Sequence, residues 1–149
     1  AAGTHDMPTL PGFWMGSDVE IAHDLGIYQD SAKMMEAYAA RTLERRAIIE
    51  ALSRVGRWFM SPERFEEELY GRELPKKMVE YVYRYLASTP SRLFLPQLED
   101  ILEQTAQMNV PGTSTEYPNW RHKLSKTIEE LRTDERMQRI CAVLRETRS

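Results

Sequence analysis

Thr4-His5-Asp6-Met7-Pro8-Thr9-Leu10 is the stretch of this 149-residue chain from which the fold can be inferred. A histidine and an aspartate stand next to each other, a proline follows, and the apolar residues Phe13 and Trp14 come shortly after. A polar pair just before a proline-opened helix is typical of the carboxyl end of a strand in α/β folds, where ligand groups gather. Only three residues precede this stretch, so the same pattern also fits a chain end with two chance polar residues. A second stretch is needed to decide between these interpretations.

That second stretch is Met108-Asn109-Val110-Pro111-Gly112-Thr113, which continues through Glu116-Tyr117-Pro118-Asn119-Trp120-Arg121. Together with residues 4–10, Gly12-Phe13-Trp14, Leu95-Pro96-Gln97 and Glu99-Asp100, it resembles the amylomaltases, which are 4-alpha-glucanotransferases or disproportionating enzymes. A lone His-Asp or Pro-Gly is a weak signal, whereas this ordered set is specific. The resemblance covers nearly the whole chain but only the C-terminal part of such an enzyme.

Apolar periodicity and capping signals predict a mainly α-helical chain with at most one or two short strands. Tyr81, Tyr83 and Tyr85 are expected around the edges of the buried stripe of one helix. The expected helices are a short one within 7–15, one over 18–27 with Ser17 as N-cap, a long one from Asp30 or Ser31 to about Phe59, a short one opened by Ser61-Pro62-Glu63, one opened by Pro75, a turn or two over 99–104, one at the capping box of Thr127, and a terminal one from Thr133-Asp134-Glu135.

Arg92-Leu93-Phe94-Leu95 is expected to form a short strand that Pro96 closes. The resemblance implies the last part of a (β/α)8 TIM-barrel glycosyltransferase of the alpha-amylase clan, with helical insertions. Residues 1–4 would end strand seven, and residues 93–96 would be strand eight. The single domain 1–149 would then divide into 1–29 with the end of strand seven and following helices, 30–90 as a helical insertion, and 91–149 with strand eight, the active-site loop and the C-terminal helix.

The composition is that of an ordinary soluble protein, with 42% hydrophobic and 29% charged residues. A net charge of −3 gives no reason to expect a nucleic-acid partner, and no apolar run is long enough to cross a membrane. The basic cluster Arg41, Arg45 and Arg46 is interleaved with acids and predicts a solvated helix face. The single Cys141 excludes an intrachain disulfide, fits a reducing cytoplasm, and is expected to be a small buried hydrophobe in the last helix.

The resemblance also implies the chemistry, which is transfer of alpha-1,4-glucan segments between maltodextrins with retention. Retaining transfer needs a carboxylate nucleophile and an acid/base carboxyl ~5 Å apart. Both belong to earlier strands that this chain lacks. Asp6 matches the third carboxylate of the family, which stabilises the transition state. His5 and Asn119 match substrate-binding residues.

The remaining residues that carry the resemblance have other expected uses. Trp14 is a further candidate for substrate binding as a stacking platform, although its spacing favours core packing. Trp120 and Arg121 are expected to hold their loop. Asn109, Pro111 and Gly112 are expected to shape the turn of the loop. Tyr117 could either pack within the loop or contact the sugar.

The expected substrate is a maltodextrin, and no cofactor or metal is expected. The missing N-terminal barrel part would be the natural partner of this piece, which is expected to be inactive alone and could dimerise through an exposed barrel face. One alternative is a helical interaction module that docks through its last or its tyrosine-rich helix. A second is an HD-type metal phosphohydrolase built on His5-Asp6 and His23-Asp24, for which only His122 remains as a further histidine ligand.

Overall fold

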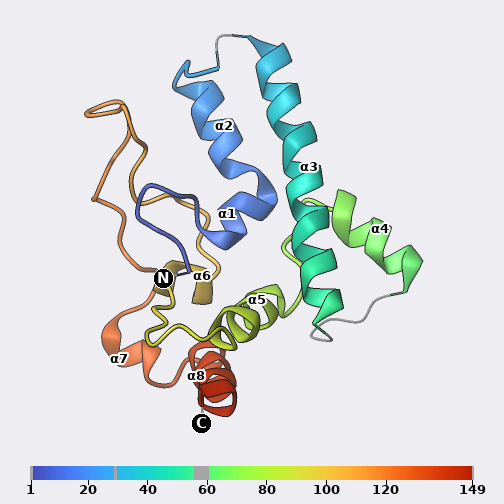
Figure 1. Cartoon of the computed structure of the whole chain (residues 1–149). Helices are drawn as coiled ribbons and strands as arrows, with labels where there is room; N and C mark the ends of the chain where they lie inside the picture. The colour runs from blue at the N-terminus through green and yellow to red at the C-terminus, as the bar shows by residue number, and fades with distance from the viewer. Residues whose placement is uncertain (1, 29, 56–60, 149) are drawn as a thin grey trace.

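The helices of this chain form a projecting arm above a base (Figure 1). The computed structural model describes residues 2–28, 30–55 and 61–148. They contain α1 (Leu10–Met15), α2 (Ser17–Asp24), α3 (Ser31–Arg54), α4 (Pro62–Tyr70), α5 (Met78–Ala87), α6 (Leu98–Ile101), α7 (Ile128–Leu131) and α8 (Glu135–Arg148).

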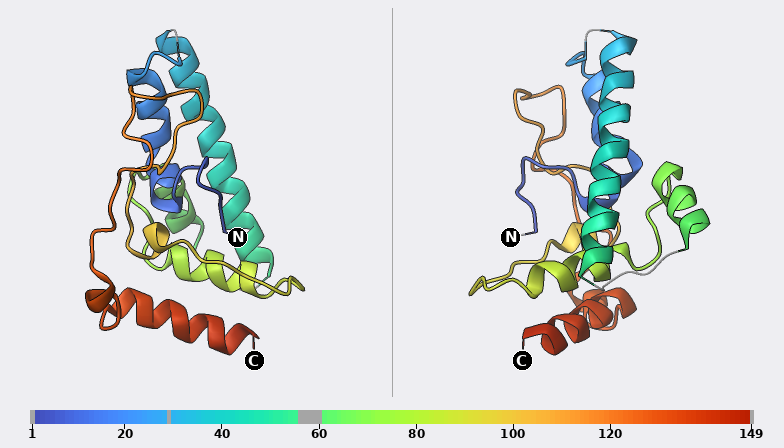
Figure 2. Two further views of the ribbon diagram at one scale, coloured as in Figure 1. Left: turned by 90° about the vertical axis from the view of Figure 1, so that its left-hand side faces the viewer. Right: turned by 45° about the vertical axis from the view of Figure 1, so that its right-hand side comes forward.

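The arm consists of α2 and α3, which lie side by side, with α4 packed against the lower part of α3. The base consists of α5 and α8, which run alongside each other beneath the arm in both views of Figure 2. None of the described helices is both long enough and apolar enough to cross a membrane. The described residues form helices and no strand, so the mainly helical class expected from the sequence is observed.

Several helix starts lie where the sequence predicts them, because a side chain caps the free N–H groups there. The Asp30 carboxylate accepts a hydrogen bond from the Lys33 N–H (2.9 Å) at the start of α3. Ser61 caps α4, whose first residue is a proline. Thr127 and Glu130 form the expected capping box at α7, with each side chain bound to the other's backbone N–H.

Two predicted helix starts are wrong by one to three residues. Ser17 is the first residue of α2 rather than its cap, since Gly16 takes the cap position in a left-handed conformation. The helix expected from Pro75 begins at Met78, because the Pro75 carbonyl accepts the Met78 N–H in a turn and Lys77 then adopts a positive φ of 67°. Neither start has a side-chain cap that the sequence could have shown.

The long helix expected to reach Phe59 ends earlier, at Arg54, where Val55 takes the C-cap position. Phe59 itself lies outside the described residues. The helical turn expected over 99–104 is α6, Leu98–Ile101. Cys141 is half-buried rather than buried.

The strand expected at Arg92-Leu93-Phe94-Leu95 is not present, and none of the described residues forms a strand. The two segments expected to pair nevertheless lie together, since the Ala2 N–H donates to the Leu95 carbonyl at 3.1 Å. One hydrogen bond is no ladder, because parallel strands need a regular series of such bonds and neighbours on both sides. The strand prediction is therefore wrong for this chain, although the adjacency behind it is seen.

The core consists of two clusters that share α5. The first contains Trp14, Ile49, Leu52 and Met78, from α1, α3 and α5. The second contains Val79, Tyr83, Ile101 and Ile140, from α5, α6 and α8. Tyr83 was expected at an edge but is fully buried, because its hydroxyl finds a buried partner on α6. A tyrosine can enter a core only when its hydroxyl is hydrogen-bonded.

The predicted solvated face of α3 is also wrong, since Arg41 and Arg45 are among the most buried polar residues. Arg41 forms a two-pronged ion pair with Asp18, with N–O distances of 2.9 and 2.7 Å. Arg45 points instead at the carbonyl ends of neighbouring helices. The two guanidinium groups therefore fasten α3 to α1, α2 and α4.

Candidate functional site

The two stretches singled out in the sequence meet in the structure, although more than a hundred residues separate Asp6 from Asn109 along the helical chain. The Asn109 amide nitrogen donates to Oδ1 of Asp6 at 2.6 Å. His5 Nε2 lies 3.3 Å from the same oxygen. In Figures 1 and 2 the N-terminal segment (dark blue) and the loop of residues 105–124 (orange) lie beside each other above the base. Their meeting places one half-exposed carboxylate at the centre of a polar cluster.

Gln107 fixes the backbone of this cluster and was not singled out in the sequence. Its buried side-chain amide donates to the Asp6 carbonyl (3.1 Å) and to the Asn109 carbonyl (2.7 Å). The Tyr117 hydroxyl donates to the Gln107 carbonyl at 2.8 Å, and burial raises the pKa of that hydroxyl. Gln107 therefore joins the two stretches from inside. Its position one residue before the Met108 stretch was the only signal in the sequence.

The exposed aromatic ring of the cluster is Trp120, not Trp14. Trp120 is 61% exposed, and its ring lies 4.9 Å from the His5 ring, centroid to centroid. Its backbone N–H donates to the Met108 carbonyl, so the residue also holds the loop as expected. Trp14 has 0% of its surface exposed and belongs to the core. A fully buried ring offers no face to a sugar, and the core packing that the spacing of Trp14 favoured is observed.

The Pro-Gly segment turns the loop back toward the cluster. Pro111 and Gly112 occupy the centre of a turn closed by a hydrogen bond from the Thr113 N–H to the Val110 carbonyl, and Gly112 has a φ of 83°. A turn with proline second and a positive φ third requires glycine at the third position. The expected turn role of these two residues is confirmed.

Asn119 closes the same turn with its side chain. Its Oδ1 accepts the Val110 N–H at 2.8 Å, and its Nδ2 donates to the Thr113 hydroxyl and carbonyl at 2.8 and 3.2 Å. The amide is therefore already engaged inside the loop. Substrate binding by Asn119 stays a prediction, and the contacts seen here give it a role in holding the loop.

The N-terminal side of the cluster is anchored by the start of α1. The Thr9 hydroxyl accepts the Gly12 N–H (3.0 Å) as a helix cap and donates to the Gln104 carbonyl (2.6 Å). Gly12 lies so close to the Thr105 backbone that a Cβ there would come within 2.6 Å of the carbonyl oxygen. Only glycine allows α1 to approach the start of the 105–124 loop this closely.

Below the cluster, a buried acid ties α1 to α5 and α6. Asp100 accepts the Leu10 N–H at 2.6 Å and the Tyr83 hydroxyl at 2.7 Å, and it is 2% exposed. Burial raises the pKa of the Asp100 carboxyl, and the two hydrogen bonds partly oppose that rise. Burial and the neighbouring carboxylate also raise the pKa of Tyr83. Asp100 therefore fixes the end of the segment that carries Asp6.

We expect Asp100→Asn to remove a dependence of stability on pH. Because the pKa of Asp100 is raised by folding, the folded state keeps its proton longer than the unfolded state. The contribution to stability is complete below the unfolded pKa of ~3.9 and is lost as pH rises through the folded pKa. The free energy of unfolding is measured by urea titration from pH 3 to 7. As the pH rises, it should fall in wild type relative to Asp100→Asn, by at most about 1.4 kcal/mol per pH unit.

The exposed Glu129→Gln variant is the control for this measurement and should run parallel to wild type. If the free energies of unfolding of wild type and Asp100→Asn differ by the same amount at every pH, Asp100 has the same pKa in the folded and unfolded states.

The HD-type alternative finds no support in the arrangement of its ligands. His23 pairs with Asp24 at 3.4 Å on the exposed end of α2, while His122 stacks near Tyr117 in the loop. Over 2–28, 30–55 and 61–148, no three His, Cys, Asp or Glu side chains gather as a metal ion would require. The two His-Asp pairs are thus separate pairs and not one ligand set.

Several known proteins are similar to this chain over most of its length. A family model described as 4-alpha-glucanotransferase matches residues 1–129, which include both stretches of the cluster. The chain is 32% identical over 136 residues to the 4-alpha-glucanotransferase of Haemophilus influenzae, which covers 91% of this chain and 19% of that protein. It is 33% identical over 148 residues to those of Mycobacterium bovis and Mycobacterium tuberculosis, covering 95% of this chain and again 19% of theirs.

The chain thus spans about a fifth of the length of the curated relatives that it matches, at 19% of each. More than half of the chain lies within the matched family region, because residues 1–129 are included. The chain belongs to the 4-alpha-glucanotransferase family.

Proposed function

We propose that this chain supplies one wall of a 4-alpha-glucanotransferase active site, in which Asp6 stabilises the transition state of glucan transfer. The observation that carries this proposal is the Asp6 carboxylate, which Asn109 and His5 hold from one side within the matched family region. A carboxylate fixed in this way needs no reorganisation when charge develops next to it. Its substrate would be an alpha-1,4-glucan, in keeping with the name of the relatives.

The two oxygens of Asp6 have different roles in this proposal. Oδ1 is the atom that faces both Asn109 and His5, whereas Oδ2 has no hydrogen bond within the described part of the chain. Oδ2 is free to accept hydrogen bonds from sugar hydroxyls. Such charge-assisted bonds strengthen as the ring takes on positive oxocarbenium character, and the barrier falls accordingly.

Trp120 completes the subsite by offering an apolar ring face beside His5. Sugar rings present C–H groups on one face, which pack well on an exposed indole. His5 would donate a hydrogen bond to the same sugar, as the sequence resemblance implies. Asn119 acts one step away, because it shapes the turn that carries Trp120.

The position of these residues fits the mouth of a (β/α)8 barrel. Ala2 and Leu95 share a backbone hydrogen bond, as the ends of adjacent strands seven and eight would. Leu93 and Leu95 are 79% and 61% exposed, which is unusual for large aliphatic residues of a finished core. The remaining part of a barrel would cover them. On this proposal 1–29 and 91–149 belong to the barrel, and 30–90 is a helical insertion.

The isolated 149-residue chain is expected to show no disproportionation of maltotriose. Retaining transfer requires a nucleophile and an acid/base carboxyl ~5 Å apart, and the proposal places both outside this chain. Chromatography of maltotriose incubated with the purified chain should show no glucose and no longer maltodextrin above a blank. Any enzyme-dependent product ladder that disappears with Asp6→Asn would contradict the placement of the nucleophile elsewhere.

A second candidate function, an interaction module without catalysis, draws on the same exposed apolar residues. Ile128 on α7 is 75% exposed, and Leu93 and Leu95 are exposed as well. These side chains favour a partner surface, but they do not account for the polar cluster around Asp6. Glucan transfer explains both features and is therefore the function that the site supports best.

A further inference from the structure

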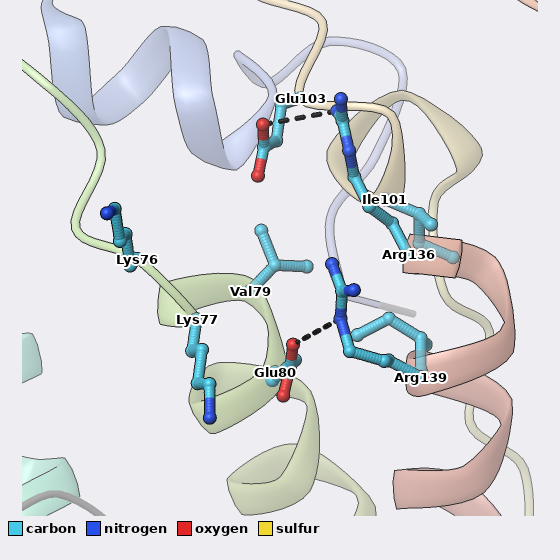
Figure 3. A pocket seen from close by; sticks show the side chains of 9 residues that line it. Lys76, Lys77, Val79, Glu80, Ile101, Glu103, Arg136 and Arg139 are labelled. Atoms are coloured by element: carbon cyan, nitrogen blue, oxygen red, sulfur yellow. Dashed lines mark hydrogen bonds and ion pairs between the residues drawn. The ribbon is translucent and has the colours of Figure 1, made fainter. Parts of the chain in front are cut away.

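A cavity of about 300 Å³ lies in the base of the molecule, where the start of α5 faces α6 and α8 (Figure 3). Val79, Ile101 and Ile140 form its apolar floor. The rest of its lining is charged and carries four cations against two acids: Lys76, Lys77, Arg136, Arg139, Glu80 and Glu103. None of these residues belongs to the Asp6 cluster, so the cavity is a separate feature of the chain.

The two arginines reach into the cavity from α8 and are held in place by acids. Arg136 pairs with Glu103 at 3.1 Å and also donates to the Leu102 carbonyl at 3.0 Å. Arg139 donates through Nε to Glu80 at 3.0 Å. Figure 3 shows both guanidinium groups extending from α8 toward α5 and α6. These acids, together with Glu135 at 3.7 Å from Nη1 of Arg139, orient the two guanidinium groups and leave the remaining N–H groups of each fork for a ligand.

The two lysines supply the surplus charge. Lys76 and Lys77 are exposed, lie on the opposite side of Val79 from the arginines in Figure 3, and have no ion pair within the described residues. The lining therefore carries two positive charges in excess, because four cations face two acids. A lysine on a flexible four-carbon stem can turn its ammonium group over a bound anion.

The backbone adds to this positive potential. Lys77 takes the N-cap position of α5 in a left-handed conformation, and no side chain caps the helix there. The free N–H groups and the positive end of the helix dipole therefore face the same region as the lysines. Glu80 is the one acid of the first turn, and Arg139 already binds it.

We propose that this cavity binds a small phosphate monoester, such as a phosphorylated hexose. Forked arginines and lysine ammonium groups are the side chains that recognise phosphate oxygens, and a helix start favours an anion further. The volume of about 300 Å³ accommodates a phosphate with one sugar ring attached but no long glucan. The apolar floor of Val79, Ile101 and Ile140 suits the ring.

The test is a titration of the 149-residue chain with inorganic phosphate and with glucose 1-phosphate, at constant ionic strength and pH 7.5. Isothermal calorimetry gives the affinity, and ¹H–¹⁵N spectra report whether the backbone N–H groups of Val79 and Glu80 shift. We expect saturable binding, tighter for the sugar phosphate. Binding should weaken at pH 5.5, where the phosphate loses its second negative charge.

Charge variants then locate the binding. The double variant Lys76→Gln, Lys77→Asn should weaken binding by about tenfold, since it removes two attractive charges, and asparagine tolerates the positive φ of position 77. Glu103→Gln should tighten binding by about threefold, because it removes a repelling acid. The matched control Lys33→Gln, Lys123→Gln removes the same charge from two exposed lysines outside the cavity.

The control variant should bind as wild type does. Equal weakening by both double variants would mean general attraction to net charge and would overturn the proposal. If neither inorganic phosphate nor glucose 1-phosphate shifts the backbone N–H signals of Val79 and Glu80, the proposal is overturned as well. Neither result touches the proposed role of Asp6, because no residue of that cluster is changed.

Discussion

Asp6→Asn in a complete 4-alpha-glucanotransferase that contains this chain is expected to slow glucan transfer by about a hundred- to a thousand-fold. The change keeps the size of the side chain and its Oδ1 acceptor for Asn109 and His5. What it removes is the negative charge that would face the oxocarbenium-like sugar. The loss corresponds to about 3–4 kcal/mol in the barrier and should appear mainly in kcat, because charge develops only in the transition state.

Initial rates of maltotriose disproportionation, measured over a range of substrate concentrations, give kcat and KM separately. Asp24→Asn is the matched control, because Asp24 also follows a histidine and lies 3.4 Å from its ring, but on the exposed end of α2. The control should transfer glucan at the wild-type rate. Normal kcat in the Asp6 variant, or a loss confined to KM, would contradict a transition-state role for Asp6.

Arg45→Ala is expected to lower the free energy of unfolding of the chain by about 3 kcal/mol. The Arg45 side chain is 6% exposed and donates to the carbonyls of Trp14, Leu69 and Gly71, at the ends of α1 and α4. Burial and the nearby positive charges of Arg41 and Arg72 lower its pKa. Truncation would leave these carbonyls without a donor and open a cavity beside Trp14.

Urea denaturation followed by circular dichroism measures this change, and the thermal midpoint should fall by about 10 °C. Arg54→Ala removes a cation from the same helix at an exposed i,i+4 pair with Glu50 and should cost less than about 0.5 kcal/mol. Arg45→Lys should lie between wild type and alanine, because one ammonium group cannot reach all three carbonyls. If alanine at position 45 is as stable as wild type, the helix ends do not depend on this guanidinium.

Local signals in the sequence predicted the helix starts well wherever a side chain makes the cap. Asp30, Ser61 and Thr127 all cap as expected, because a cap depends on three or four neighbouring residues. The starts at Gly16 and Lys77 were missed, since both rest on a backbone conformation imposed by packing. Boundaries set by tertiary contacts leave no local pattern.

The site was predictable in outline but not in its contacts. The ordered motifs singled out Asp6 and His5, and the structure brings Asn109 and Trp120 to them. The spacing of Trp14 favoured core packing, which is observed, whereas the exposed Trp120 ring beside His5 was not predicted, because Trp120 was expected only to hold its loop. Gln107 was missed because a buried amide that holds two backbone segments looks, in one sequence, like any polar loop residue.

The core shows the same limit of prediction from sequence, because the burial of Arg41, Arg45 and Tyr83 was not expected. Their polar groups can be buried because hydrogen-bond acceptors are available in the interior, namely Asp18, the helix-end carbonyls and Asp100. Those partners lie between 17 and 31 residues away along the chain. Helical periodicity assigns polar residues to the surface by default and has no information about such distant partners.

The place of α5 between the two clusters has a consequence for how this chain comes apart. One ten-residue helix gives Met78 to the upper cluster and Val79 and Tyr83 to the lower one. Loss of packing in either cluster would destabilise α5, on which the other cluster also depends. Arm and base are therefore expected to unfold in one cooperative transition, and cleavage of the chain on either side of α5 would separate this helix from one of the two clusters.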